Sequence, residues 1–456
     1  PYIPDRYKEG YGISMSGIDA AKEEGITLII ALDCGIKAHK QVNYAAEKGI
    51  DFIICDHHLP SKILPPAVAV LDPKRDDCDY PFKELCGCGI GFKLIQAVQK
   101  HLNFSQEALT IYLDLVATAI AADIVPMEGE NRTLTFLGLQ QFQENPRIGL
   151  QFFLKTLKKP IKVTDLVFVI APRINAAGRM DQGLSAVELL MSDNLELALP
   201  KARSIDFFNT ERRSTDERIT VEALQQIVLN EETTCFSTVV FHPSWHKGVI
   251  GIVASRLIET YYRPTVVLTE SEGVLSGSVR SVSGFDVYQA LEACSEFMIQ
   301  FGGHKYAAGL TLKPEQLTGF KQCFEAYAEA HLLPEQLQPT YSYDLELQFD
   351  ALTPKLYRII NQMAPFGPKN MRPVFVTHLC KDAGGTRAVG KENNHLKLEI
   401  IDAAGIPFQG IAFGMAQYLI QIKNQQSFSL LYTLEENEYN GIAFLQLKVK
   451  DLVFTP

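Results

Sequence analysis

Two short runs of aliphatic and β-branched residues, separated by one helix-length segment, constrain the fold of this chain most strongly. Residues 26–32 and 50–55 are too short to be buried helices, and they have the composition of strands that are covered on both faces. Between them, residues 38–48 carry apolar side chains at helical spacing and end in a Lys-Gly stop. Residues 67–71 form a third apolar run. A strand, a helix and a strand in this order predict a parallel α/β sheet.

The rest of the chain divides into segments that differ in their pattern of apolar and polar residues. A length of 456 residues predicts about three domains. Helices are expected at residues 89–101 and 106–122, and a long polar-faced helix at 195–229 is expected to bridge two lobes. Alternating apolar and polar residues after position 341 predict a small β-barrel or sandwich. The expected segments are an α/β domain at 1–194, a connecting helix at 195–230, a second α/β domain at 231–335 and a β-barrel at 341–456.

Composition excludes several classes of protein. With 46% apolar and 21% charged residues, the chain has an ordinary globular composition. No stretch approaches the roughly 18 uncharged apolar residues of a membrane span, and the first residues lack the features of a secretory signal. Nine cysteines, scattered and mostly in apolar runs, favour reduced thiols in a cytoplasmic protein. The net charge of −10 argues against a basic duplex-binding protein, but it is compatible with an enzyme that handles phosphates through metal ions.

Acidic and imidazole side chains stand where the predicted buried elements end. Asp33 follows the first apolar run, Asp56-His57-His58 follows the second, and Asp123 ends the apolar helix. The carboxyl ends of neighbouring parallel strands meet at one crevice. Carboxylates and imidazoles suit Mn²⁺ or a similar ion, and two ions about 3.5–4 Å apart can activate water for displacement at phosphorus. Singly, each motif is more often a turn, a surface pair or a helix stop, so the prediction depends on their joint placement.

These motifs resemble those of the DHH phosphoesterases, and in particular those of the bacterial RecJ family. The likeness runs in order along the chain, through residues 2–12, 32–35, 56–58, 122–127, 172–179, 245–254, 277–281 and 302–309. It implies a DHH domain at 1–194, a DHHA1 substrate-binding domain at 231–335 and an oligonucleotide-binding (OB) barrel at 341–456. It also implies that the family's first motif, which carries a His and two Asp, lies upstream of Pro1.

The resemblance further implies a role for each matching residue. Asp33 is expected to bridge two metal ions, and His57 and Asp123 to bind the second ion. His58 is expected to contact the scissile phosphate, while Asp56 orients the histidines. The implied cofactor is a pair of divalent ions, Mn²⁺ or Mg²⁺. Most ligands of the first ion are expected upstream of Pro1.

The second α/β domain is expected to hold the substrate. Gly302 and Gly303 predict a turn where the backbone can approach a phosphate closely, and His304 can donate a hydrogen bond to the same group. Ser278 and Arg280 lie on a predicted strand, where the forked guanidinium can hold a terminal phosphate. A Gly-Gly pair is more often only a turn, so the resemblance carries this prediction.

Further contacts to a single strand are expected from other parts of the chain. The resemblance implies that Arg6 reads the 5′ end and that Arg173 or Arg179 assists, although a lone arginine more commonly forms a surface ion pair. The barrel is expected to bind single strands by base stacking and basic side chains. Its candidate contacts are Arg372, Phe375, Lys391, Lys397 and Phe413. Residues 87–91 lack the spacing of a dinucleotide loop, so close helix packing is the better interpretation.

The expected function is metal-dependent hydrolysis of single-stranded DNA from the 5′ end to mononucleotides, in DNA repair and recombination. The expected protein is a cytoplasmic monomer, with a helicase and a single-strand-binding protein as candidate partners and no membrane contact. Two alternatives stay open. One is a phosphodiesterase of short oligonucleotides or cyclic dinucleotides, against which the long helix and the barrel argue. The other is single-strand binding without cleavage, because most ligands of the first ion are expected outside this chain.

Overall fold

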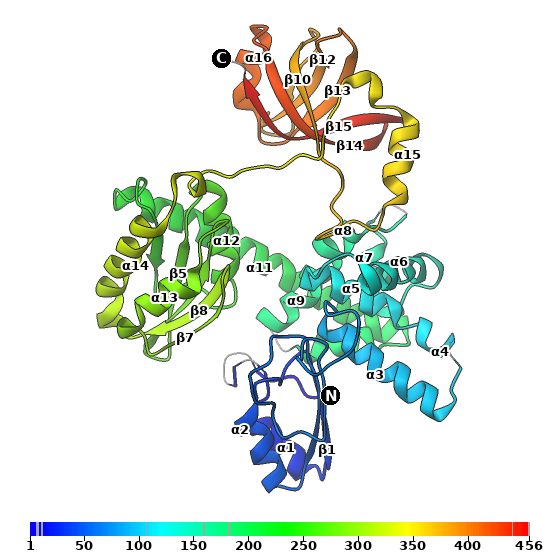
Figure 1. Cartoon of the computed structure of the whole chain (residues 1–456), viewed down its shortest axis with the longest axis vertical. Coiled ribbons are helices and arrows are strands. Elements are labelled where there is room, and N and C mark those ends of the chain that lie inside the picture. Colours follow the sequence, from blue (N-terminus) through cyan, green and yellow to red (C-terminus); the bar gives the residue numbers. More distant parts are fainter. Residues whose placement is uncertain are drawn as a thin grey trace.

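The computed structural model describes residues 1–5, 9–10, 12–105, 107–157, 160–180, 183–439 and 441–454. Two α/β lobes are joined by a long helix, and a β-barrel lies beside them (Figure 1). This is the predicted fold class. Each of the three bodies has buried apolar clusters of its own. Within the described residues, no helix is long and apolar enough to cross a membrane.

The first lobe begins with a three-stranded parallel sheet in the order β1-β2-β3. Leu32 pairs with Cys55, and Cys55 pairs with Leu71, so the three strands end together at one edge. The parallel arrangement confirms the strand-helix-strand prediction. The elements of this part are α1 (Met15–Glu23), β1 (Leu28–Leu32), α2 (His39–Glu47), β2 (Asp51–Cys55) and β3 (Ala69–Leu71).

Helices complete the first lobe, and one prediction is corrected here. The single helix expected at 106–122 is two helices, α4 and α5, separated by a turn at residues 111–112. Asp114 lies in the first turn of α5. Its carboxylate accepts the backbone N–H of Leu115 at 2.8 Å and pairs with Arg147 at 2.9 Å, and a negative charge is favoured in the first turn of a helix. The helices are α3 (Gly87–Leu102), α4 (Glu107–Thr110), α5 (Leu113–Asp123), α6 (Gly129–Glu144), α7 (Gln151–Leu154), α8 (Val163–Asp165), a π-helix (Leu166–Ile170), α9 (Ala171–Met180) and α10 (Leu184–Leu190).

The long helix α11 (Leu195–Leu229) runs from the first lobe to the second, as Figure 1 shows. The second lobe has a five-stranded sheet in the order β4-β5-β6-β8-β7, in which only β4 and β5 are parallel. Its elements are β4 (Thr238–Phe241), α12 (Ile250–Thr260), β5 (Thr265–Ser271), β6 (Val274–Arg280), α13 (Val287–Ala293), β7 (Gln300–His304), β8 (Ala307–Leu312) and α14 (Leu317–His331).

The last body is a seven-stranded sheet in the order β11-β12-β13-β15-β14-β10-β9, which a further pairing of β12 with β10 closes into a barrel. Its connection to the first lobe is specific. The backbone N–H of Met127 donates to Pro368 O at 2.7 Å, and Arg132 donates to the carbonyls of Met363 and Ala364. The elements are β9 (Leu345–Glu346), α15 (Pro354–Gln362), β10 (Phe375–Asp382), β11 (Arg387–Val389), β12 (His395–Ile401), β13 (Pro407–Ala412), α16 (Leu419–Lys423), β14 (Phe428–Tyr439) and β15 (Ile442–Phe454).

Candidate active site

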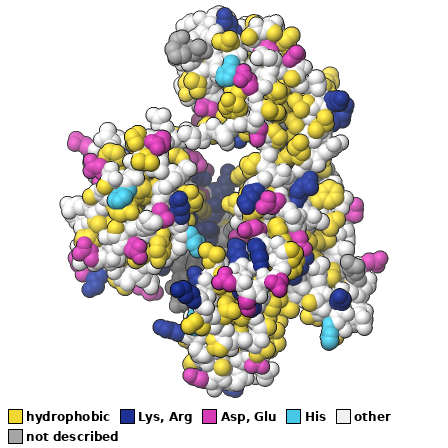
Figure 2. Space-filling model, viewed as in Figure 1, with side chains coloured by type: hydrophobic (Ala, Val, Ile, Leu, Met, Phe, Trp, Pro, Cys, Tyr) yellow, Lys and Arg dark blue, Asp and Glu magenta, His cyan; other side chains and the backbone are white. Residues whose placement is uncertain are grey.

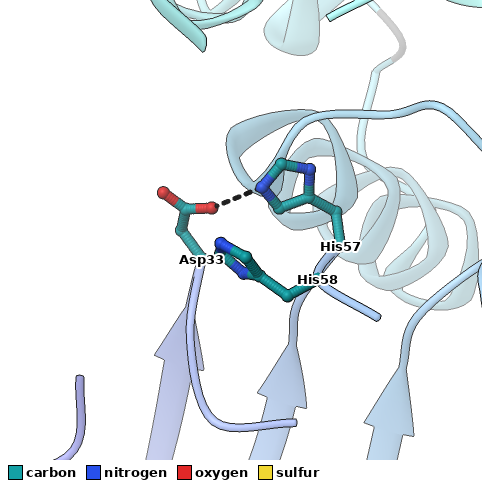
Figure 3. A group of neighbouring side chains, drawn as sticks. All are labelled: Asp33, His57 and His58. Atoms are coloured by element: carbon teal, nitrogen blue, oxygen red, sulfur yellow. Dashed lines mark ion pairs between the residues drawn. The ribbon is translucent and has the colours of Figure 1, made fainter. Parts of the chain in front are cut away.

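His57 lies at the centre of the polar cluster at the ends of the parallel strands. Its Nε2 atom is 3.1 Å from Asp33 Oδ1 and 3.5 Å from Asp123 Oδ2. Ligand atoms of Asp33, His57 and His58 all lie within 4.8 Å of one another, and Figure 3 shows the three side chains around one space. Two carboxylates and two imidazoles thus converge from β1, β2 and α5, as the strand-end pattern predicted.

Asp33 has a backbone conformation that few residues adopt. Its φ is +63°, in the left-handed region that Asp tolerates better than most side chains. Its N–H donates to Cys55 O at 2.8 Å, so the strand pairing continues into the turn. The carboxylate packs against the first residue of α3, Gly87, where a Cβ would lie only 2.2 Å from Asp33 Oδ1. Gly87, at the glycine-rich start of α3, therefore makes room for Asp33, which is the close helix packing that the sequence favoured.

Asp56 is buried and organises the turn after β2. Its carboxylate accepts hydrogen bonds from the backbone N–H groups of Ile36 (2.9 Å) and His57 (2.8 Å), and from the His58 ring Nδ1 at 2.6 Å. Burial alone would raise the pKa of Asp56, but the hydrogen bonds from His58 and Ile36 outweigh it and hold the pKa at about 2. The same contact with Asp56 raises the pKa of His58. Asp56 thus fixes the ring of His58.

Asp123 comes to the cluster from the end of α5. The pKa of its carboxyl is raised, mainly by burial and to a smaller extent by the nearby charge of Asp33. The next residue, Ile124, ends the helix with φ +59°, which is costly for a β-branched side chain. This strained turn directs the chain toward Met127, which contacts the segment leading into the barrel.

Sequence reasoning missed Asp72, which follows β3 as Asp33 follows β1 and Asp56 follows β2. It is 3% exposed, and its Oδ1 accepts the backbone N–H of Lys74 at 2.8 Å. Burial raises the pKa of its carboxyl. The signal was present in the sequence, because the third apolar run, residues 67–71, ends in the same way as the other two.

In the second lobe, Ser278 and Arg280 lie together on β6, as predicted. Arg280 Nη1 donates to Ser278 Oγ at 3.2 Å. Both side chains face the start of α12, where a Cβ at Gly251 would lie 2.9 Å from Ser278 Oγ and 3.1 Å from Arg280 Nη2. A helix N-terminus beside an arginine and a hydroxyl is a favourable environment for a phosphate. Gly251 had no role assigned from the sequence, because its closeness to β6 is a tertiary contact.

The prediction of a turn at Gly302 and Gly303 was wrong, because both residues lie within strand β7. Gly302 pairs with Gly309 and Gly303 with Ala308 on β8. Gly303 has φ +149°, and a Cβ there would lie 2.4 Å from Ala307 O, so only glycine fits the tight hairpin. Around Gly302, by contrast, a Cβ would meet no atom within 4 Å. This strand and His304 are exposed, which leaves the surface open to a ligand.

The three remaining arginines have different surroundings. Arg6 lies outside the described residues. Arg179 Nη1 donates to Gly248 O at 3.0 Å, which ties α9 to the loop before α12. Arg173 instead pairs with Asp206 of α11 at 2.8 Å and lies over the ring of Phe153 of α7, so these contacts are not with the other predicted substrate residues.

The barrel candidates divide into accessible and buried side chains. Phe375 is only 2% exposed and packs in the core, so its prediction as a stacking contact was wrong. Phe413 is 53% exposed beside the His395 ring, and Lys391 is exposed. Lys397 is half-buried, and Arg372 stacks on Phe366 with 4.5 Å between its guanidinium carbon and the ring centre.

Lys and Arg side chains gather in and around a hollow between the two lobes and the barrel, as Figure 2 shows. The chain as a whole carries a net charge of −10. Positive charge is therefore concentrated locally, where a polyanionic strand can be attracted despite the acidic composition.

This fold and site define a DHH-type phosphoesterase architecture with an added OB barrel. Residues 1–120 match the family model "DHH family, N-terminal domain", residues 232–330 match "DHHA1 domain", and residues 343–451 match "RecJ OB domain". The chain is 34% identical to the single-stranded-DNA-specific exonuclease RecJ of Salmonella typhimurium, over 99% of this chain and 81% of that protein. The chain belongs to the RecJ family.

Other members of the family agree in sequence and in fold. The RecJ exonuclease of Bacillus subtilis is 35% identical over 99% of this chain, which spans 57% of that protein. The crystal structure of Thermus thermophilus RecJ in complex with Mn²⁺ superposes with a TM-score of 0.84 at 27% identity, covering 97% of this chain and 64% of that one. The chain therefore spans less than two thirds of these two relatives.

Proposed function

We propose that this protein hydrolyses single-stranded DNA from the 5′ end and releases mononucleotides, with divalent metal ions held by Asp33, His57 and Asp123. The observation that carries the proposal is the convergence of Asp33, His57 and His58 ligand atoms within 4.8 Å at the carboxyl edge of the parallel sheet. Relatives that share the fold are named single-stranded-DNA-specific exonucleases, and solved RecJ structures hold Mn²⁺ or Mg²⁺.

The donor set fits such an ion. Carboxylate oxygens and a neutral imidazole nitrogen are ligands of Mn²⁺, and oxygen ligands suit Mg²⁺. Two carboxylates face His57 Nε2 at 3.1 and 3.5 Å, which concentrates negative charge where a cation is needed. Bound divalent metal would supply an activated water and would neutralise the charge that develops on the phosphate.

The other residues have roles in holding the substrate. His58, whose pKa is raised by Asp56, carries positive charge more readily than a free histidine and can donate to a phosphate oxygen. Ser278, Arg280 and the N-terminus of α12 offer donors to a terminal phosphate. The exposed backbone around Gly302 lets a strand approach β7, with His304 beside it.

The experiment is to replace Asp33 with Ala and to measure Mn²⁺-dependent release of nucleotides from a 5′-labelled single strand. The variant is expected to lose cleavage and to keep the circular dichroism and melting temperature of the parent. Asp76→Ala, which removes an exposed carboxylate from a nearby loop, is the matched control and is expected to stay active. Undiminished cleavage by Asp33→Ala would rule out the assignment.

Two other functions give different results in the same assay. A phosphodiesterase of short oligonucleotides would turn over dinucleotides faster than strands of 20 or more nucleotides. A binding protein without nuclease activity would retain long strands in a gel-shift experiment and release no nucleotide with any divalent ion. The barrel, which the contacts of Met127 and Arg132 hold against the first lobe, favours long strands.

We also propose that the protein acts as a cytoplasmic monomer in DNA repair and recombination, with a helicase and a single-strand-binding protein as partners. The family relationship supports the DNA substrate. All nine cysteines are free thiols, as expected in a reducing compartment. Light scattering of the purified chain and pull-down from a cell extract would test the monomer and the partners.

A further inference from the structure

The structure contains two buried polar atoms near the strand ends that have no hydrogen-bond partner among the described residues. One is His57 Nδ1 and the other is Asp72 Oδ2. His57 is 8% exposed and Asp72 is 3% exposed. A buried polar atom without a partner costs about 1–3 kcal/mol, so each of these two atoms calls for an explanation.

The two residues follow neighbouring parallel strands. Cys55 pairs with Leu71, and the N–H of Asp56 donates to Leu71 O at 3.0 Å, so the parallel pairing continues past both strand ends. His57 is the second residue beyond β2 and Asp72 is the first beyond β3. In Figure 3, one ring nitrogen of His57 is directed at Asp33, and the other lies on the opposite side of the ring.

The two atoms are also chemically complementary. A histidine that binds a metal through Nε2 must carry its proton on Nδ1, and this proton is usually donated to a carboxylate, a carbonyl or a water. Asp72 Oδ1 already accepts the Lys74 N–H, which leaves Oδ2 as a free acceptor. Burial is the largest effect on the pKa of the Asp72 carboxyl and raises it, whereas the charge of the His57 ring is close enough to lower it slightly.

We propose that Asp72 is a positioning residue that accepts the Nδ1–H of His57 at Oδ2 through one bridging water, and so holds Nε2 toward the metal position. This inference rests on the proposed function, because it assumes that His57 is a metal ligand. Asp72 itself does not touch the metal or the substrate. It fixes the tautomer and the orientation of His57, as Asp56 fixes His58 on the other side.

The first test is the Mn²⁺ affinity of the whole chain, measured by titration calorimetry. Loss of such an outer partner typically weakens metal binding roughly 10- to 100-fold. Asp72→Ala is therefore expected to bind Mn²⁺ at least about tenfold more weakly than the parent. Asp72→Asn keeps one acceptor oxygen and is expected to lose less. Asp76→Asn, with the same charge change at an exposed position of the same loop, is the control and should bind like the parent.

Each pattern of affinities has one interpretation. Equal losses in Asp72→Asn and Asp72→Ala would mean that charge matters and not a hydrogen bond, and they would overturn the inference. Parental affinity in Asp72→Ala would overturn it as well. Failure of the parent itself to bind Mn²⁺ would count against the proposed function, and the second test then decides the inference.

The second test needs no metal. In the protein labelled with ¹⁵N at histidine, the Nδ1 proton of His57 is expected to exchange slowly and to give an observable resonance, which is assigned by its loss in His57→Gln. The resonance should disappear in Asp72→Ala and remain in Asp76→Asn. Its persistence in Asp72→Ala, at an unchanged ¹⁵N shift, would refute the hydrogen bond. A purely structural role of Asp72 would lower the melting temperature without moving this signal selectively.

Discussion

Replacing Gly87 with Ala tests whether the first turn of α3 sets the position of Asp33. The new methyl group would lie 2.2 Å from Asp33 Oδ1 and 2.5 Å from its Cβ, whereas ordinary contact begins near 3.4 Å. The carboxylate must therefore retreat by about 1 Å. Overpacking of this size costs about 1–3 kcal/mol, and the helical preference of Ala over Gly returns about 0.5–1 kcal/mol. The free energy of unfolding is expected to fall by no more than about 2.5 kcal/mol.

Activity is expected to suffer far more than stability. A displacement of about 1 Å at a catalytic group can lower the rate roughly 100-fold. The assays are urea denaturation and Mn²⁺-dependent release of nucleotides from a single strand. Gly91→Ala is the matched control, because its methyl group would meet only the flexible end of Leu32 at 3.3 Å. If Gly87→Ala cleaves as fast as Gly91→Ala, then Asp33 does not depend on this contact.

Three further changes have defined outcomes. Ile124→Gly should raise the free energy of unfolding by about 1 kcal/mol in urea denaturation, since glycine adopts the left-handed conformation without strain and little packing is lost; a loss would show that the turn is not strained. Arg280→Ala should raise KM roughly tenfold or more for 5′-phosphorylated strands and less for 5′-hydroxyl strands, because a charged hydrogen bond contributes about 1.5–3 kcal/mol. An equal rise in KM for both kinds of strand would place Arg280 away from the 5′ end. The pKa of Asp382 is lowered, because hydrogen bonds from Thr386 and Lys423 outweigh burial. Its contribution to folding stability is therefore present above the unfolded pKa and is lost as the pH falls through the lower folded value. The melting temperature of Asp382→Asn should accordingly depend less on pH below about 4 than that of the parent.

The site could be predicted from the sequence because its residues follow periodic elements. The apolar runs at 26–32 and 50–55 identified two strands, and a parallel sheet brings their ends together whatever the details of packing. Asp33 and His57 consequently lie 3.1 Å apart although they are distant in sequence. The long helix was equally accessible, since no glycine interrupts residues 201–229.

Other features depend on contacts that no local pattern contains. Gly87 matters because of Asp33, 54 positions earlier, and Gly251 matters because of the β6 side chains. Gly302 and Gly303 looked like a turn because their composition is that of a turn, yet pairing with β8 makes them a strand. Phe375 was assigned to the wrong face of its strand, because alternation alone does not say which face is the core.

The contacts that hold the barrel connect it with the polar cluster around His57. Met127 is only four residues beyond Asp123, and a Cβ at Gly367 would lie 2.9 Å from the Met127 side chain, so the two segments pack closely. The turn at Ile124 that presents Asp123 to His57 is therefore followed directly by the contact that fixes the barrel. The hydrogen bonds of Met127 and Arg132 therefore attach the segment that leads into the barrel to the chain just after α5, so a flexible linker alone does not set the position of the barrel.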